Sequence, residues 1–230
     1  MTYEEVLAEL FLHEDEGYRN FHGKLLKNDN VNLIGVRIPV LRKLAKLWKK
    51  ESDCFLTFPD EYYEVTFLKC AIVGMLPFDQ FCQCVDLVVP LLDNWATCDC
   101  FDAPCIKKNR EAFLPYVARY LADEREFVAR YGLVTLLRYY VDAQYLPLIF
   151  ESAERANADQ YYVMMAAAWL IAEVVIKFYD EGLAYLKERK LSAPIHNKAI
   201  QKARESFRLS KEQKCELNAL KVNKEKQYEF

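Results

Sequence analysis

The chain is 230 residues long, 53% of them hydrophobic and 28% charged, and its formal net charge is −3. This length can bury a sizeable core, and the six glycines and the abundant Leu, Ala, Glu and Lys predict a nearly all-α fold. A membrane span is excluded, because the best candidate stretch, residues 163–176, is short and contains Glu173. The acidic N-terminus lacks the apolar run of a secretory signal, so we expect a cytoplasmic protein with reduced thiols.

The charges are unevenly distributed along the chain. Residues 24–50 carry eight Lys and Arg against one acid, and residues 51–100 carry one Lys against nine acids. Residues 186–230 are basic again, with twelve Lys and Arg against six acids. Both basic segments could therefore face a polyanion although the whole chain is acidic, and solvated helix faces are the alternative explanation.

The eight cysteines do not match a metal-binding pattern. Those between residues 82 and 105 show C-x-C rather than C-x-x-C spacing, and the three histidines are distant in sequence. We expect them to serve as small buried apolar side chains, and we expect no metal site.

The predicted helices begin at a capping box, in which Thr2 is followed by Glu5 and by apolar residues at helical spacing. A second helix is predicted at about 15–27. Gly35 then allows a turn, and Pro39 fits the first turn of the next helix, which is apolar on one side and strongly basic around the rest.

The remaining pattern is helical to about residue 219, without a Pro/Gly/Ser linker. The predicted helices run from Pro59 through Val73 and cover about 78–92, 94–103, 107–121, 124–141, 144–156, 159–178, 181–189, 195–208 and 210–219. We interpret residues 1–220 as a single HEAT-like repeat domain and 221–230 as a polar C-terminal tail.

Four residues form the candidate site. Helix pairs recur roughly every 35–45 residues, a period typical of HEAT-type repeats. Trp95, Arg130 and Trp169 are 35 and 39 residues apart, so they would occupy equivalent places in successive repeats. In an α-α superhelix such places line a concave, partly basic groove. Asp99, one helical turn after Trp95, would share its face, and this combination suits a ligand that carries or develops positive charge.

Each candidate also has an ordinary structural explanation. A single Trp on an amphipathic helix more often belongs to the core. Asp99 could cap a helix or pair with Lys107 or Lys108, and Arg130 could pair with Glu126 one turn earlier. The shared period is stronger evidence than any one residue, but it does not identify a reaction.

Four segments carry a resemblance to a known family. The segments are Gly-Val-Arg-x-Pro-x-Leu-Arg-x-x-Ala-Lys from Gly35, Asn-Trp-Ala-Thr-Cys-Asp at 94–99, Phe-Val-Ala-Arg at 127–130, and Ala-Ala-Ala-Trp-Leu-Ile-Ala-Glu at 166–173. Their order and spacing over about 20–205 resemble the DNA alkylation repair (AlkD-like) DNA glycosylases. The first string is fairly specific, and the other three are persuasive only together.

The resemblance implies a superhelix of HEAT-like repeats that binds duplex DNA on its concave face. It also implies an enzyme that excises cationic N-alkylated purines, such as 3-methyladenine and 7-methylguanine, without a metal or cofactor. Glycosylases usually extrude the target base, whereas this family acts without a base-flipping pocket. Asp99 would stabilise the developing oxocarbenium-like charge and orient water, while Trp95 and Trp169 would contact the sugar and cationic nucleotide through their π faces. Arg130 would hold a backbone phosphate.

Further duplex contacts are expected from the basic segments. These residues are Arg37, Arg42, Lys43, Lys46, Lys198 and Lys202. The family often carries Lys four residues before and Arg three residues after the later tryptophan, and Met165 and Ala172 occupy those positions here.

Two functions follow from the sequence. The leading one is a monofunctional glycosylase of base excision repair that acts as a monomer on alkylated duplex DNA. The alternative is a non-catalytic HEAT-like module that binds structured nucleic acid or a protein partner, because fold alone does not imply activity.

Overall fold

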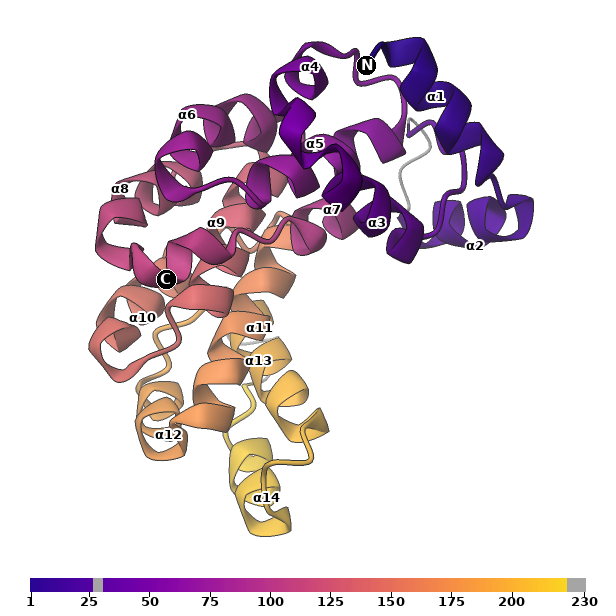
Figure 1. Ribbon diagram of the computed structural model, residues 1–230. Helices are drawn as coiled ribbons and strands as arrows, with labels where there is room; N and C mark the ends of the chain where they lie inside the picture. Colours follow the sequence, from indigo (N-terminus) through magenta and orange to yellow (C-terminus); the bar gives the residue numbers. More distant parts are fainter. Residues whose placement is uncertain (27–30, 223–230) are drawn as a thin grey trace. The chain divides into compact units, whose positions relative to one another are not determined.

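The computed structural model describes residues 1–26 and 31–222, and within these ranges the chain is helical and contains no strand (Figure 1). The all-α prediction is therefore confirmed. Most of the predicted tail, 221–230, lies outside the described residues. The chain divides into two compact units, Met1–Glu111 and Ala112–Phe230. The prediction of one continuous domain over 1–220 stays a prediction.

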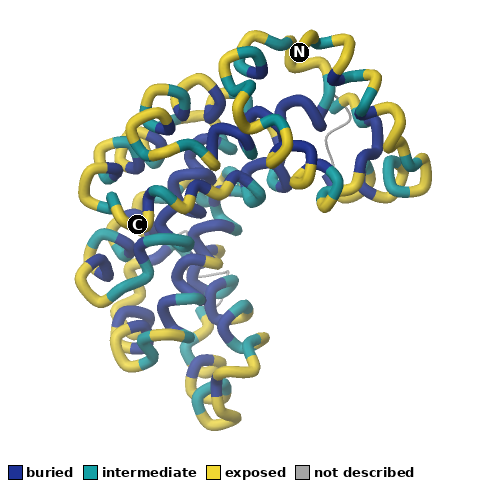
Figure 2. Tube along the Cα trace, viewed as in Figure 1, coloured by how far each residue is buried: buried dark blue, intermediate teal, exposed yellow. Residues whose placement is uncertain are grey.

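The first unit is organised around one buried helix. Its elements are α1 (Tyr3–Leu12), α2 (Glu16–Leu26), α3 (Ile38–Trp48), η1 (Lys49–Glu51), α4 (Ser52–Thr57), α5 (Tyr63–Gly74), α6 (Phe78–Val88), η2 (Val89–Leu91), α7 (Trp95–Cys100) and η3 (Pro104–Lys108). Almost every residue of α5 is buried, and α3, α4, α6 and α7 pack against it (Figure 2). The core of this unit therefore surrounds α5, which links α3 to α7.

The second unit is organised in the same way around α11. Its elements are α8 (Arg110–Leu121), which begins at the boundary, α9 (Glu126–Tyr139), η4 (Ala143–Tyr145), α10 (Leu146–Glu154), α11 (Tyr161–Lys177), α12 (Tyr179–Glu188), α13 (Ala193–Glu205) and α14 (Lys211–Ala219). Helices α9, α10, α12 and α13 pack against α11, whose buried Ala166, Ala167 and Ala168 allow close approach.

Local sequence signals account for many of the helix ends. The capping box at Thr2 is present, and Pro39 lies in the first turn of α3. The predicted helix at 195–208 is too long, because α13 ends at Glu205 and Ser206 adopts an extended conformation. The short helix α4 was not predicted from the sequence.

No helix among the described residues combines the length and apolarity that a membrane span requires.

Candidate functional site

The four candidate residues divide between the two units. Trp95 and Asp99 lie on α7 in the first unit, whereas Arg130 on α9 and Trp169 on α11 lie in the second. The predicted groove that would unite the two halves stays a prediction.

Helix α7 starts at a strong N-cap. The Asn94 side-chain oxygen accepts a hydrogen bond from the Thr97 backbone N–H at 2.9 Å, and its amide donates to Thr97 Oγ1 at 3.1 Å. Because Asn94 is 1% exposed, this cap is protected from water. Trp95 and Asp99 are therefore one turn apart on a well-defined helix, and both side chains are partly exposed.

The orientation of the Trp95 indole is set by a contact with α2. Its Nε1 donates a hydrogen bond to the backbone carbonyl of Leu25 at 3.1 Å, and the ring packs partly against the core of the first unit. The ring is thus partly packed in the core and partly accessible to a ligand, so both the structural and the functional explanation of Trp95 remain open. The contact joins residues 70 positions apart, so no local pattern could reveal it.

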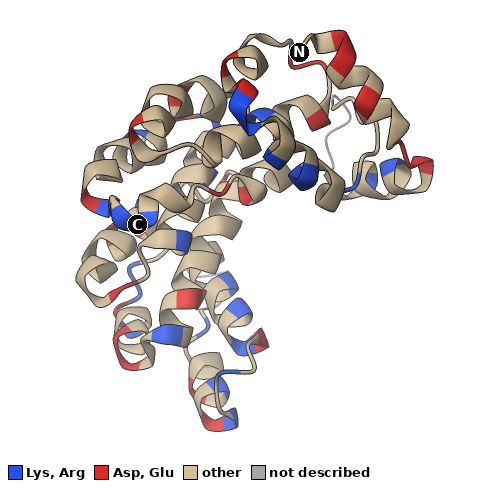
Figure 3. Ribbon diagram, in the orientation of Figure 1, with Lys and Arg blue, Asp and Glu red and all other residues tan. Residues whose placement is uncertain are grey.

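The basic face of α3 is exposed. Leu41, Leu44 and Ala45 are buried against the rest of the unit, whereas Arg42 and Lys43 point to solvent, as does Lys46. Figure 3 shows Lys and Arg along α3. This exposure is what a phosphate contact would need, although solvated lysines look the same.

Arg37, which precedes α3, is held in an ion pair. Its Nε and Nη2 donate to Asp15 Oδ2 at 2.9 and 2.8 Å, and its guanidinium lies 5.2 Å from the centre of the Tyr18 ring. Hydrogen bonds from the Tyr18 backbone and from Arg37 lower the pKa of Asp15, so the pair is charged at neutral pH. The pair uses the Nε and Nη2 donors of Arg37, whose side chain is 59% exposed, so a phosphate would share the guanidinium with Asp15.

The loop before α3 is fixed by a buried carboxylate. Glu64 on α5 is 1% exposed and accepts backbone hydrogen bonds from Ile34 at 3.1 Å, Gly35 at 2.8 Å and Val36 at 3.2 Å. Burial raises the pKa of Glu64, and the three N–H donors oppose that shift. Gly35 has φ of 99°, and a Cβ there would lie 2.6 Å from the Asp15 carbonyl oxygen, so this position requires glycine.

In the second unit, Arg130 is buried and holds the start of α11. The side chain is 6% exposed, and Nη1 donates to the Tyr162 carbonyl at 2.8 Å, with the guanidinium 5.9 Å from the Tyr162 ring centre. Glu126 Oε1 accepts from the Tyr162 backbone N–H at 2.6 Å. Arg130 and Glu126, both on α9, therefore bind the backbone of the same residue, Tyr162. Arg130 is more buried than an arginine that binds phosphate from the protein surface usually is.

Trp169 is exposed and has charged neighbours. The side chain is 36% exposed on α11, one turn before Glu173, whose Oε1 accepts a hydrogen bond from Arg208 Nη2 at 2.7 Å. On α11 itself, Met165 and Ala172 occupy the positions where the family often carries Lys and Arg. The tertiary structure brings Arg208 to Glu173, from 35 residues further along the chain.

Lys198 and Lys202 lie one turn apart on α13. Both are partly buried, and Lys198 Nζ donates to Gln201 Oε1 at 3.0 Å. Their spacing puts both ammonium groups on one face of the helix, as the predicted phosphate contacts require.

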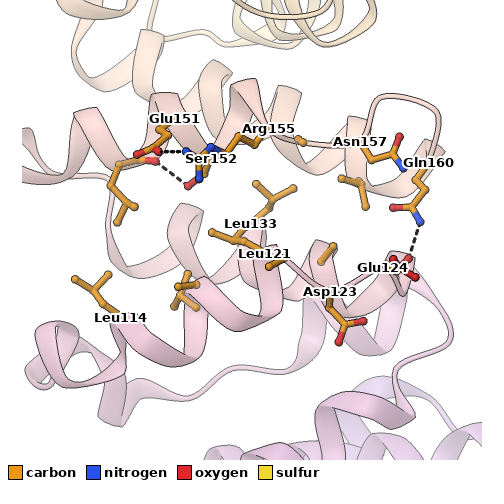
Figure 4. A pocket seen from close by; sticks show the side chains of 17 residues that line it. Leu114, Leu121, Asp123, Glu124, Leu133, Glu151, Ser152, Arg155, Asn157 and Gln160 are labelled. Atoms are coloured by element: carbon orange, nitrogen blue, oxygen red, sulfur yellow. Dashed lines mark hydrogen bonds and ion pairs between the residues drawn. The ribbon is translucent and has the colours of Figure 1, made fainter.

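A cavity of about 750 Å³ lies in the second unit, and its wall includes Ala129 and Val163, the chain neighbours of Arg130 and Tyr162. Apolar side chains such as Leu121 and Leu133 line it, and the Glu151–Arg155 ion pair at 2.7 Å stands at its edge (Figure 4). No aromatic side chain and no candidate residue is among those lining it. It therefore offers no stacking surface for a base, and we do not assign the site to it.

The cysteines are free thiols, with Cys70 and Cys98 fully buried and Cys215 exposed. Within residues 1–26 and 31–222, no three His, Cys, Asp or Glu side chains gather as a metal ion would require.

A comparison with known families identifies the family of the chain. A family model described as DNA alkylation repair enzyme matches residues 6–207. The chain belongs to this family, and the match spans most of each unit and includes all four candidate residues. No curated protein matches the chain.

Proposed function

We propose that this DNA alkylation repair enzyme is a monofunctional DNA glycosylase that removes cationic N-alkylated purines, such as 3-methyladenine and 7-methylguanine, from duplex DNA. The observation that carries the proposal is that Trp95 and Asp99 lie one turn apart on a capped helix, with both side chains partly exposed, in a chain of this family. The protein acts as a cytoplasmic monomer in this proposal.

The chemistry needs few groups because the substrate is already charged. When the bond between the purine nitrogen and C1′ breaks, its electron pair returns to the base, which leaves neutral and needs no general acid. Positive charge develops on the deoxyribose, and the Asp99 carboxylate stabilises it and orients a water whose oxygen bonds to C1′. The proton of that water passes to the carboxylate or to solvent.

The two indoles would recognise the charge on the nucleotide. Cations attract the negative face of an aromatic ring, and each such contact contributes about 0.5–2 kcal/mol. The Leu25 carbonyl fixes the Trp95 ring before substrate binds, so little orientational freedom is lost on binding.

Arg130 has two roles in the proposal. Its hydrogen bond to the Tyr162 carbonyl fixes the start of α11, the helix that carries Trp169. The small exposed part of the side chain would contact a phosphate, which approaches with the duplex. Arg37, Arg42, Lys43, Lys46, Lys198 and Lys202 would contact flanking phosphates.

Base release from methylated duplex DNA tests the proposal directly. We expect the purified protein to release 7-methylguanine and the Asp99→Asn variant to release it at least about 100-fold more slowly, the size of effect that loss of an electrostatic catalyst produces. Asp102→Asn is the matched control, because Asp102 is exposed just beyond α7. Thermal unfolding of both variants should match the wild type.

A second candidate is a non-catalytic HEAT-like module that binds structured nucleic acid or a protein partner. Met165 and Ala172 favour it, because they stand where the family often carries Lys and Arg around the later tryptophan. Duplex binding by the wild type without base release above background would contradict the glycosylase and support this module.

A further inference from the structure

One turn of the chain brings an arginine next to the Trp169 face of α11. Trp169 and Glu173 are four residues apart on α11, so their side chains leave the helix on the same face. The Glu173 carboxylate binds Arg208 at 2.7 Å, and the Arg208 side chain is 60% exposed. Arg208 is therefore bound to the side chain that lies one helical turn after Trp169 on α11.

Helix α11 has no cation of its own near Trp169. Lys177, its last residue, is the only Lys or Arg in the helix and lies two turns beyond Trp169. Its Nζ donates to the Val141 carbonyl, so it is committed to another contact. Arg208 thus brings positive charge to this face from outside α11.

The turn that carries Arg208 is fixed at both ends. The Ser206 N–H donates to the Ala203 carbonyl at 3.1 Å, and the Arg208 N–H donates to Ser206 Oγ at 3.2 Å. Leu209 is 7% exposed and anchors the far side, whereas the intervening Phe207 is fully exposed. A well-anchored turn thus exposes two side chains that are adjacent in the sequence, an aromatic ring and a guanidinium.

We infer that the Phe207–Arg208 turn is a contact with the DNA backbone beside Trp169, in which Arg208 binds a phosphate and Phe207 packs against the adjoining sugar. This inference rests on the proposed function for its choice of ligand. Neither residue was among the individual site residues predicted from the sequence, although Arg208 lies in the basic segment 186–230.

The chemistry of both side chains favours DNA. Arginine presents five N–H donors in a planar fork, and Glu173 engages Nη2, so other donors can bind a phosphate. Glu173 also holds the guanidinium in place, which limits the freedom lost on binding. An exposed aromatic ring beside a phosphate-binding residue is suited to contact a sugar or a splayed base.

The test measures the affinity of the full-length protein for unmodified duplex DNA as a function of salt. Each phosphate contact contributes about 0.9 to the slope of log K against log salt, so Arg208→Ala should lower the slope by about that amount and weaken binding at low salt. The matched control is Arg155→Ala, because Arg155 is exposed and pairs with Glu151 at the same distance, 2.7 Å. We expect the control to keep the wild-type slope.

Two further variants separate the contributions of charge and ring. Glu173→Gln keeps an acceptor for Arg208 but removes a negative charge near the phosphate, so duplex affinity should rise, whereas Glu151→Gln should leave it unchanged. Phe207→Ala should weaken binding without changing the slope, because the ring releases no counterion.

The inference is overturned if Arg208→Ala keeps the wild-type slope, or if Arg155→Ala lowers the slope by the same amount. It is also overturned if duplex binding by the wild-type protein does not depend on salt. If Phe207→Ala binds duplex DNA with wild-type affinity, the proposed contact of Phe207 with the sugar is overturned. A lowered Arg208→Ala slope in a protein that releases no alkylated base supports the DNA contact and contradicts the glycosylase, so the two proposals can fail separately.

Discussion

Replacing Glu64 with alanine should strongly destabilise the first unit. Glu64 is the acceptor for three consecutive buried backbone N–H groups, those of Ile34, Gly35 and Val36, which lead into the basic helix α3. Alanine leaves all three donors without this partner in a place that water does not reach, since Ile34 and Val36 are 1% and 0% exposed. The loop should therefore loosen together with the start of α3.

The size of the effect follows from these contacts. Each buried donor left unsatisfied costs about 1–3 kcal/mol, so three would cost roughly 3–9 kcal/mol. Burial raises the pKa of Glu64, so the ionised carboxylate itself has a desolvation cost, which the alanine variant removes. We therefore expect a net loss near the lower end, about 3–5 kcal/mol. Glu64→Gln keeps an oxygen for Gly35 and Val36 but turns an amide NH₂ toward Ile34, and it should cost about 1–3 kcal/mol.

Urea unfolding at pH 7 measures this loss. Trp48 and Trp95 lie in the first unit and Trp169 in the second, so in a Trp169→Phe background the fluorescence reports the first unit alone. A lower midpoint with an unchanged slope indicates lost stability rather than a more compact unfolded state. Glu61→Ala is the control, because Glu61 is exposed and accepts a hydrogen bond from Tyr3.

The reasoning would be refuted by a Glu64→Ala loss below about 1 kcal/mol, because the backbone donors would then have found other partners or water. It would also fail if Glu61→Ala, expected to change stability by no more than about 0.5 kcal/mol, cost as much as Glu64→Ala. Equal losses in Glu64→Ala and Glu64→Gln would show that the charge matters more than the number of accepted hydrogen bonds.

Three other predictions concern stability. Gly74→Ala places a Cβ 2.1 Å from the Asp102 carbonyl oxygen, so the free energy of unfolding should fall by about 1–3 kcal/mol and the melting temperature should fall with it. An unchanged melting temperature would contradict this close approach. Burial lowers the pKa of His196 below its ordinary 6.5, so its contribution to stability is present above pH 6.5 and is lost as the pH falls below it. The urea midpoint should drop between pH 7 and pH 5, and less so in His196→Gln, which can still donate to the Leu220 carbonyl; an equal drop in both proteins would argue against this residue. Trp95→Phe removes the indole donor to the carbonyl near the end of α2 and should cost the first unit about 0.5–1.5 kcal/mol in urea unfolding, with wild-type stability as the contrary result.

Much of the helical framework could be predicted because its signals are local. The capping box at Thr2 and the proline in the first turn of α3 act on groups within a few residues. The apolar spacing of α3 likewise specifies which face is buried. Trp95 and Asp99 share α7 for the same reason, since their separation is one helical turn.

The environment of the candidate residues could not be predicted in this way. Spacing brought Arg130 into the candidate set, but its enclosure depends on Tyr162, 32 residues later. Arg208 was predicted to lie in a helix, whereas it occupies a turn and binds Glu173. Such contacts depend on which helices pack together, and no local pattern contains that information.

By itself, the sequence determined that the chain is helical, where most helices begin, and which family motifs it carries, because hydrogen bonding and capping within a helix act over a few residues. Only the tertiary structure decided which side chains are available for chemistry. It enclosed Arg130, held Arg37 against Asp15 and bound Arg208 to Glu173 on α11. Exposure and charge pairing arise from contacts between distant segments, so they become definite only when the helices are packed.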